Sequence, residues 1–189
     1  MVKTILITGA TDGIGKHLAK KLASQGHHVI LHGRNPQKLE LALQEVRAVS
    51  LRGRVSSYLA DFSKLDDVYR FVEEIKRDFQ SIDVLFNNAG LYGGKERKVS
   101  TENVELTFML SVLIPYMLTI ELSPLLEKAP DGRIINTSSY MHHFAKVKDL
   151  DFGFENNYNP GLAYKNSKVY TISMTSYLAR DLFLKVENI

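Results

Sequence analysis

A tyrosine and a lysine near the end of the sequence have the types and the spacing of an acid/base pair. Tyr164 and Lys168 are four positions apart, so on a helix they project from the same face with neighbouring Cβ atoms. An ammonium beside a phenol favours the phenolate, and a close opposite charge commonly lowers an acid's pKa by roughly 1 to 3 units. The same spacing is also typical of an ordinary helix surface. Whether the pair is an acid/base centre or an ordinary helix surface pair therefore depends on the other motifs of the chain.

A serine close to two histidines is a second group that could do chemistry. Ser139 is followed by His142 and His143, and a serine activated by a histidine is the nucleophile of many hydrolases. The sequence has no Gly-x-Ser-x-Gly elbow around this serine. A serine hydrolase is thus an alternative, but we expect the histidines to be loop or pocket-wall residues.

A glycine-rich turn near the N-terminus could bind a dinucleotide. Residues 4–8 form a short, β-branched apolar run that is typical of a buried parallel strand. Gly9, Gly13 and Gly15 follow, and apolar residues then recur at helical spacing over residues 16–24. Glycines let a backbone approach a pyrophosphate, and the start of the next helix offers free N–H groups. Strand, glycine turn and helix together predict a dinucleotide site.

An arginine at the end of the second predicted strand indicates which dinucleotide binds. The strand over residues 27–32 ends at Gly33-Arg34-Asn35. In such folds an acid near this point binds the ribose 2′-OH of NAD, whereas an arginine accommodates the 2′-phosphate of NADP. The chain has Arg34 and no acid here, so we expect NADP to bind better than NAD.

Strands and helices alternate along the rest of the chain. Single helices between strands imply right-handed crossovers and a parallel sheet that is covered on both faces. The fold class is therefore α/β, a doubly wound parallel sheet of Rossmann type with three αβα layers, in one domain over residues 1–189. The further strands are expected at residues 54–60, 82–86 and 133–137, and the further helices at 36–48, 64–79, 101–127 (with a kink at Pro115) and 162–184.

The composition is that of a single folded domain. The chain has 189 residues, of which 44% are hydrophobic and 24% charged, and no cysteine, so disulfides, metal–thiolate sites and cysteine nucleophiles are excluded and we expect no metal. Acidic and basic residues are interleaved at a net charge of +3, so we expect no nucleic-acid partner. No run approaches the length of a membrane helix and the first apolar run is too short for a signal peptide, so we expect a cytoplasmic protein without a membrane span.

Together these motifs resemble those of the short-chain dehydrogenase/reductase family. The glycine motif at residues 8–15, Asn-Asn-Ala-Gly at 87–90, Ile-Asn-Thr-Ser-Ser at 135–139 and the Tyr-x-x-x-Lys pair occur in the family's order. Residues 133–142 and 162–182 look most like the retinol dehydrogenase and protochlorophyllide reductase branch. The resemblance implies an NADP-dependent oxidoreductase that transfers a hydride between nicotinamide and an apolar alcohol or carbonyl substrate. It also implies a homodimer or homotetramer that assembles through the long helix and the tyrosine helix.

The resemblance assigns roles to individual residues. Tyr164 becomes the general acid/base, Lys168 its partner and a ligand of the nicotinamide ribose, and Ser139 a hydrogen-bond donor to the substrate oxygen. Arg34 takes the 2′-phosphate and Asp61 the adenine amino group. The residues expected at the cofactor are Gly9, Thr11, Asp12, Gly13, Ile14, Gly15, Arg34, Asp61, Phe62, Asn88, Ala89, Gly90, Tyr164 and Lys168.

Two departures from the family pattern keep an alternative open. In the family an asparagine of the long helix holds a water of the proton relay. Ser111 stands there in this chain, and we expect its hydroxyl to hold the water in this catalytic role. The chain also ends at Ile189, which implies that the family's last strands are lacking and that the fifth strand is an exposed edge. The alternative is a nucleotide-binding protein of the same fold without turnover. A sugar-nucleotide epimerase shares Tyr-x-x-x-Lys, but the glycine spacing fits the short-chain pattern better.

Overall fold

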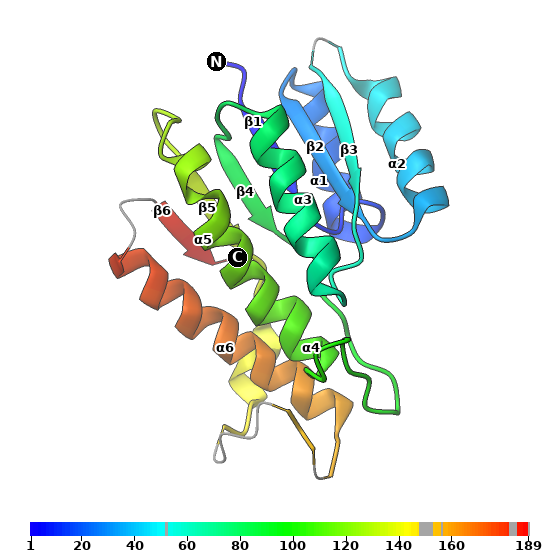
Figure 1. The fold of residues 1–189 in the computed structure, drawn as a ribbon, viewed down its shortest axis with the longest axis vertical. Coiled ribbons are helices and arrows are strands. Elements are labelled where there is room, and N and C mark those ends of the chain that lie inside the picture. The colour runs from blue at the N-terminus through cyan, green and yellow to red at the C-terminus, as the bar shows by residue number, and fades with distance from the viewer. Residues whose placement is uncertain (52, 148–152, 156, 182–184, 189) are drawn as a thin grey trace.

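Six parallel strands form one sheet that is covered by helices on both faces (Figure 1). The computed structural model describes residues 1–189 except 52, 148–152, 156, 182–184 and 189. The strands lie in the order β3-β2-β1-β4-β5-β6, and the predicted doubly wound α/β fold is confirmed. The strands are β1 (Thr4–Ile7), β2 (His28–Gly33), β3 (Val55–Leu59), β4 (Val84–Asn87), β5 (Arg133–Asn136) and β6 (Lys185–Asn188), and the helices are α1 (Gly13–Ser24), α2 (Pro36–Val49), α3 (Leu65–Asp78), α4 (Leu106–Phe108), the π-helix η1 (Met109–Leu113), α5 (Ile114–Leu126), the 3₁₀-helix η2 (Tyr140–Phe144) and α6 (Pro160–Asp181).

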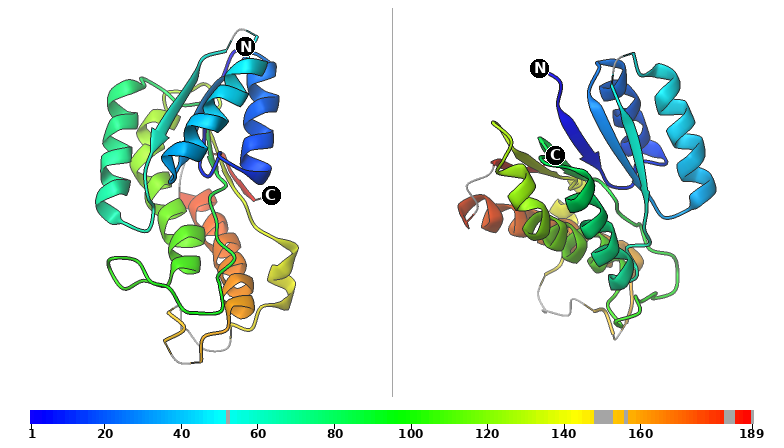
Figure 2. Two further views of the ribbon diagram at one scale, coloured as in Figure 1. Left: turned by 90° about the vertical axis from the view of Figure 1, so that its right-hand side faces the viewer. Right: turned by 45° about the horizontal axis from the view of Figure 1, so that its top comes forward.

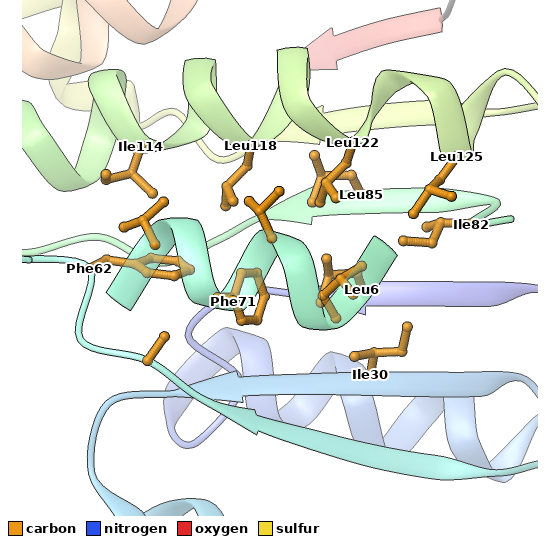
Figure 3. Packing of buried hydrophobic residues seen from close by; sticks show 14 of the residues in the cluster. Leu6, Ile30, Phe62, Phe71, Ile82, Leu85, Ile114, Leu118, Leu122 and Leu125 are labelled. Atoms are coloured by element: carbon orange, nitrogen blue, oxygen red, sulfur yellow. The ribbon is translucent and has the colours of Figure 1, made fainter. Parts of the chain in front are cut away.

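Alternation along the strands gives the sheet one hydrophobic core on each face. Leu6 and Leu85 belong to the core that α3 and α5 cover, which Figure 3 shows from close by. Their neighbours Ile7 and Phe86 belong to the core under α1 and α2. Successive strand residues point to opposite faces, so a strand in the middle of the sheet must be apolar throughout. Figure 2 shows α1 and α2 on one side of the sheet and α3 and α5 on the other.

The long apolar helix is built from three consecutive pieces. It begins at Leu106, where the Glu105 side chain caps it by accepting from Phe108 N–H, and passes through α4, η1 and α5. Pro115 has no N–H to bond the Ser111 carbonyl. Ile114 N–H bonds the Met109 carbonyl five residues earlier, the π-helical pattern. The kink predicted at Pro115 is thus a π-turn directly before the proline.

This helical stretch corrects the prediction that no run in the sequence approaches the length of a membrane helix. Leu106–Leu126 is 21 residues long, and by length and composition it is apolar enough to cross a membrane. Half of it is buried, and α5 packs against α3, β4 and β5 inside the fold. A core helix passes the same test of length and composition, so the stretch is only weak evidence for a membrane span.

A sixth strand follows the tyrosine helix. β6 runs parallel to β5 and pairs with it from Arg133 and Lys185 to Asn136 and Asn188. The prediction that β5 forms the exposed edge of the sheet is therefore wrong. The short run 185–188 carries little local strand signal in the sequence, and it becomes a strand because the edge of β5 offers unpaired backbone groups.

Candidate functional site

The carboxyl ends of the strands border a cleft where the strand order reverses. β1 and β4 are neighbours in the sheet although β2 and β3 lie between them in sequence, and open α/β sheets bind ligands at such a point. The cleft has a volume of about 760 Å³, within the roughly 300–1,000 Å³ of typical ligand pockets. Of the residues predicted from the sequence, its walls contain Gly9, Thr11, Asp12, Gly13, Ile14, Arg34, Asp61, Phe62, Asn88, Ala89, Gly90, Tyr164 and Lys168.

The glycine turn after β1 is packed tightly against the turn after β4. Gly9 has φ of +65°, and a Cβ there would lie 2.9 Å from Ala89 Cα. A Cβ on Gly15 would lie 2.5 Å from both Asn88 Nδ2 and the Gly9 oxygen. The Asn88 amide donates to the carbonyls of Thr8 and Gly9 at 2.9 and 3.2 Å. Gly15 lies outside the cleft walls, so it acts by letting helix α1 approach this turn.

The start of α1 faces the cleft with an acidic cap. The Asp12 carboxylate accepts from Gly13 N–H at 2.8 Å and lies 3.5 Å from Lys38 Nζ. The bond from Gly13 N–H, followed by the Lys38 charge, lowers the pKa of Asp12 below its ordinary value. The remaining N–H groups of the first turn and the positive end of the helix dipole suit an anionic group of a ligand.

The ends of β2 and β3 form the other end of the cleft. Arg34 lies in its wall together with Lys38, which follows four residues later on the first turn of α2. Asp61 has one carboxylate oxygen, Oδ1, that accepts from both the backbone N–H and the hydroxyl of Ser63, at 3.1 and 2.8 Å. These bonds fix the carboxylate and leave Oδ2 as an acceptor for a ligand. Two cations and one oriented carboxylate suit a phosphorylated adenosine.

The tyrosine and the lysine of α6 lie at the opposite end of the same cleft. Lys168 is 5% exposed, and its Nζ donates to the Thr137 carbonyl at 3.0 Å. Nζ also lies 5.3 Å from the centre of the Tyr164 ring. Burial lowers the pKa of Lys168 to about 8. The Tyr92 ring, from the loop after β4, also lines the cleft, and its centre lies 5.2 Å from that of the Tyr164 ring.

A buried polar network holds α6 against the sheet. Asn87 donates to Asn136 at 2.8 Å, and Asn136 donates to Thr175 of α6 at 3.0 Å. Thr171, one turn earlier on α6, donates to the carbonyl of Ser111 at 3.0 Å. That carbonyl is the one left without an N–H partner by Pro115. The proline in one helix thus creates the acceptor that helps to position the helix with Tyr164 and Lys168.

Two predicted catalytic serines do not line the cleft. Ser111 is buried on η1, and its hydroxyl has no hydrogen-bond partner among the residues that the structure describes. Ser139 is half-buried at the start of η2, where its Oγ accepts from Met141 N–H at 3.3 Å. That bond leaves the Ser139 O–H as a donor. The structure therefore brings Tyr164 and Lys168 together with the glycine turn, whereas neither serine is among the residues that line the cleft.

The histidines after Ser139 do not form a hydrolase site. His142 Nδ1 contacts the backbone carbonyl of Ser139 at 2.7 Å, not its hydroxyl, and the two histidine rings lie 4.0 Å apart. A base that activates serine must reach the hydroxyl proton. The geometry does not support the serine hydrolase alternative.

Several cleft residues are absent from the prediction. Lys38 could have been found, because it lies in the first turn of α2, three residues after the cap Asn35 and close in sequence to Arg34. His32 carries no local signal, since its contacts come from strands that lie far away in the sequence. The cleft residues beyond the predicted set are His32, Gly33, Asn35, Lys38, Leu91, Tyr92, Leu110 and Thr137.

Comparisons with known proteins agree with the site. A family model described as "short chain dehydrogenase" matches residues 3–186. Human retinol dehydrogenase 11 is 33% identical over 180 residues, which cover 95% of this chain and 56% of that protein. Human polyprenol dehydrogenase is 32% identical over 184 residues, with 95% and 56% covered. The chain thus spans about half the length of these curated relatives.

A solved structure with cofactor has the same fold. A protein from Shigella flexneri, described as a short chain dehydrogenase complexed with NADP, superposes with a TM-score of 0.78 at 27% identity. The match covers 98% of this chain and 75% of that one. The likeness of the fold therefore extends over nearly the whole of this chain.

Proposed function

The chain belongs to the short-chain dehydrogenase/reductase family, and we propose that it is an NADP-dependent oxidoreductase. In this proposal a hydride passes between nicotinamide and an apolar alcohol or carbonyl compound. One observation carries it: Tyr164 and Lys168 share a single cleft with the glycine turn and with Arg34. An acid/base pair at one end and a phosphate-binding turn with a cation at the other are the parts that such a reaction requires.

The residues of the cleft fit NADP. The glycine turn can approach a pyrophosphate because Gly9 and Gly13 adopt positive φ of 65° and 50° and nothing lies within 4 Å of a Cβ on Gly13. Arg34 and Lys38 would hold the 2′-phosphate, Asp61 the adenine amino group and Lys168 the nicotinamide ribose. The structure of the Shigella flexneri protein with NADP supports this choice. When bound, the cofactor supplies or accepts the hydride.

The chemistry of this chain is the movement of a proton. In reduction Tyr164 gives a proton to the carbonyl oxygen, and in oxidation it takes one from the alcohol. A positioned acid/base contributes on the order of 10² to 10⁴ in rate. With a pKa of about 8, Lys168 is mainly charged at neutral pH. Its ammonium lies 5.3 Å from the centre of the Tyr164 ring.

An apolar substrate is favoured by the surroundings of Tyr164 and by the relatives. Leu91, Tyr92 and Leu110 line the cleft beside the acid/base pair. The relatives are named for retinol and polyprenol, which are both long apolar alcohols. The chain covers about half of those proteins, so the substrate class is part of the proposal.

Turnover with an aldehyde series tests the function. We expect NADPH to be oxidised with retinal or a long aliphatic aldehyde and much more slowly with glyceraldehyde, which is small and polar. Tyr164→Phe should reduce turnover at least about 100-fold while NADPH still binds, because it removes only the hydroxyl. Equal turnover by wild type and Tyr164→Phe would refute the assignment.

A nucleotide-binding protein without turnover is the second candidate. It is favoured by Ser111, whose carbonyl is already bonded to Thr171 and whose hydroxyl replaces the amide of the family's asparagine. In that case NADPH binds but no aldehyde of the series is reduced. Ser111→Asn should then restore turnover if the residue alone is responsible.

Assembly and location complete the proposal. We propose a homodimer or homotetramer through α5 and α6, supported by the exposed apolar residues Tyr116, Ile120 and Tyr177 on these helices, at 40%, 40% and 52% exposure. Light scattering should then give at least twice the monomer mass, and Tyr116→Glu should reduce it. We also propose a cytoplasmic location, which cell fractionation tests.

A further inference from the structure

We propose that His32 is a positioning residue for the adenosine half of the dinucleotide site, acting as a neutral imidazole that ties the ends of three strands together. The inference rests on the proposed NADP binding. His32 is the last residue but one of β2, is 3% exposed and lies in the wall of the cleft. No step of the proposed reaction uses it.

The two ring nitrogens bond to two different turns of the site. Gly9 N–H donates to His32 Nδ1 at 3.2 Å, and Nε2 lies 3.0 Å from the Ala60 carbonyl. Gly9 opens the glycine turn, and Ala60 directly precedes Asp61. One side chain thus connects the turn expected at the pyrophosphate with the turn expected at the adenine.

These partners determine the tautomer. Because Nδ1 accepts from an N–H, it carries no proton, so the proton is on Nε2 and points at the Ala60 carbonyl. Protonation of Nδ1 would break the bond to Gly9 and bury a charge. Burial lowers the pKa of His32 to about 4, and the ring is therefore neutral at physiological pH.

Two aromatic neighbours hold the imidazole ring: Phe62, which lines the cleft, and Phe71, which belongs to the hydrophobic core. It stacks on Phe62 with centroids 3.8 Å apart and planes 9° from parallel, and it meets the edge of Phe71 at 5.2 Å. Phe62 lines the cleft next to Asp61. Rotation of the imidazole would therefore disturb both its hydrogen bonds and this cleft residue.

Backbone hydrogen bonds already join β2 to the chain after β1 and β3, so the imidazole is not needed to pair the strands. The His32 carbonyl accepts from Ala10 N–H at 2.9 Å, and the Gly33 carbonyl accepts from Ala60 N–H at 3.2 Å. The strands are thus paired without the imidazole. The imidazole adds one bond on each side just beyond the ladder, where the chain turns toward the ligand.

Three variants separate the contacts of the ring. His32→Asn can keep an acceptor near Nδ1, His32→Gln can keep a donor near Nε2, and His32→Phe keeps only the aromatic stack. Each lost bond should weaken NADPH binding about three- to tenfold and the loss of both about ten- to 100-fold. The same factor should appear for adenosine 2′,5′-bisphosphate and not for nicotinamide mononucleotide, and kcat at saturating NADPH should stay within about twofold.

A second histidine of β2 supplies the matched control. His28 is half-buried, bonds Ser56 and contacts Phe79, and it is not part of the cleft wall. His28→Phe should leave both affinities unchanged. If the role of His32 were merely structural, the three His32 variants would have lower melting temperatures, but the folded variants would bind NADPH with unchanged affinity.

The tautomer can be read without any cofactor. Nitrogen NMR of the histidine rings should show His32 as the Nε2–H form with unprotonated Nδ1. The opposite tautomer, or unchanged NADPH affinity in all three His32 variants while wild type binds NADPH, would overturn the inference and leave the proposed function standing. If wild type binds neither NADPH nor the bisphosphate, both the inference and the proposed function fail.

Discussion

Lys168 should destabilise the fold at neutral pH, and its replacement by methionine should stabilise it. The ammonium is 5% exposed, and burial lowers its pKa from 10.5 to about 8. At about 1.36 kcal/mol for each pKa unit, burial of the charge costs roughly 3 kcal/mol. Loss of the bond from Nζ to the Thr137 carbonyl offsets about 1 kcal/mol of the gain. We therefore expect Lys168→Met to raise the free energy of unfolding by about 2 kcal/mol at pH 7.

The pH dependence distinguishes this cause from better packing. The folded-state pKa is below that of the unfolded chain, so the unfolded chain binds more protons between about pH 8 and pH 10.5 and stability rises with pH there. Wild type should therefore gain about 2 kcal/mol from pH 7 to pH 9.5, and the difference from Lys168→Met should shrink to nearly zero.

Urea unfolding of the cofactor-free protein, followed by circular dichroism at a series of pH values, measures this difference. Groups that titrate in both proteins cancel in the comparison. Lys168→Arg is the matched control, because its guanidinium stays charged throughout the range and its stability should fall progressively behind that of wild type as the pH rises. A difference between wild type and Lys168→Met that does not change from pH 7 to pH 9.5 would refute the reasoning.

Two further substitutions test the cofactor end of the cleft. Arg34→Ala should weaken NADPH binding about 10- to 100-fold, since a charge-assisted bond to the 2′-phosphate is lost, and should leave NADH binding unchanged in calorimetric titrations; equal losses for both cofactors would argue against the assignment of Arg34. Gly15→Ala should lower the free energy of unfolding by about 1 to 3 kcal/mol, because its Cβ would lie 2.5 Å from Asn88 Nδ2 and the Gly9 oxygen. Gly94→Ala, where nothing lies within 4 Å of a Cβ, is its control, and similar urea midpoints for the two variants would count against the close packing.

The sequence was sufficient for the order of the elements and for the two ends of the cleft. The glycine turn, Arg34 and the Tyr164–Lys168 pair each come with a local signal, either an unusual backbone requirement or a fixed spacing at the end of a strand or on a helix. Pro115 also signals a break, because a missing N–H has the same effect in any helix. Topology then brings these motifs together, since all parallel strands end at one edge.

The remaining features depend on contacts between distant parts of the chain. His32 looks like any strand residue until Gly9 and Ala60, 23 and 28 positions away, meet its two nitrogens. The bond between Thr171 and the Ser111 carbonyl needs α6 to pack on η1. β6 forms because an edge of β5 is available. Such features are set by tertiary structure, which neither spacing nor composition encodes locally.

Transfer of deuterium from C4-labelled NADPH to an apolar aldehyde tests most directly whether the cleft unites cofactor and acid/base chemistry. Mass spectrometry of the alcohol product of retinal should show one deuterium with wild type. Tyr164→Phe should still bind the labelled NADPH and give labelled product at least about 100-fold more slowly. Labelled alcohol from Tyr164→Phe at the wild-type rate, or a wild-type protein that binds no NADPH, would contradict the assignment of this cleft.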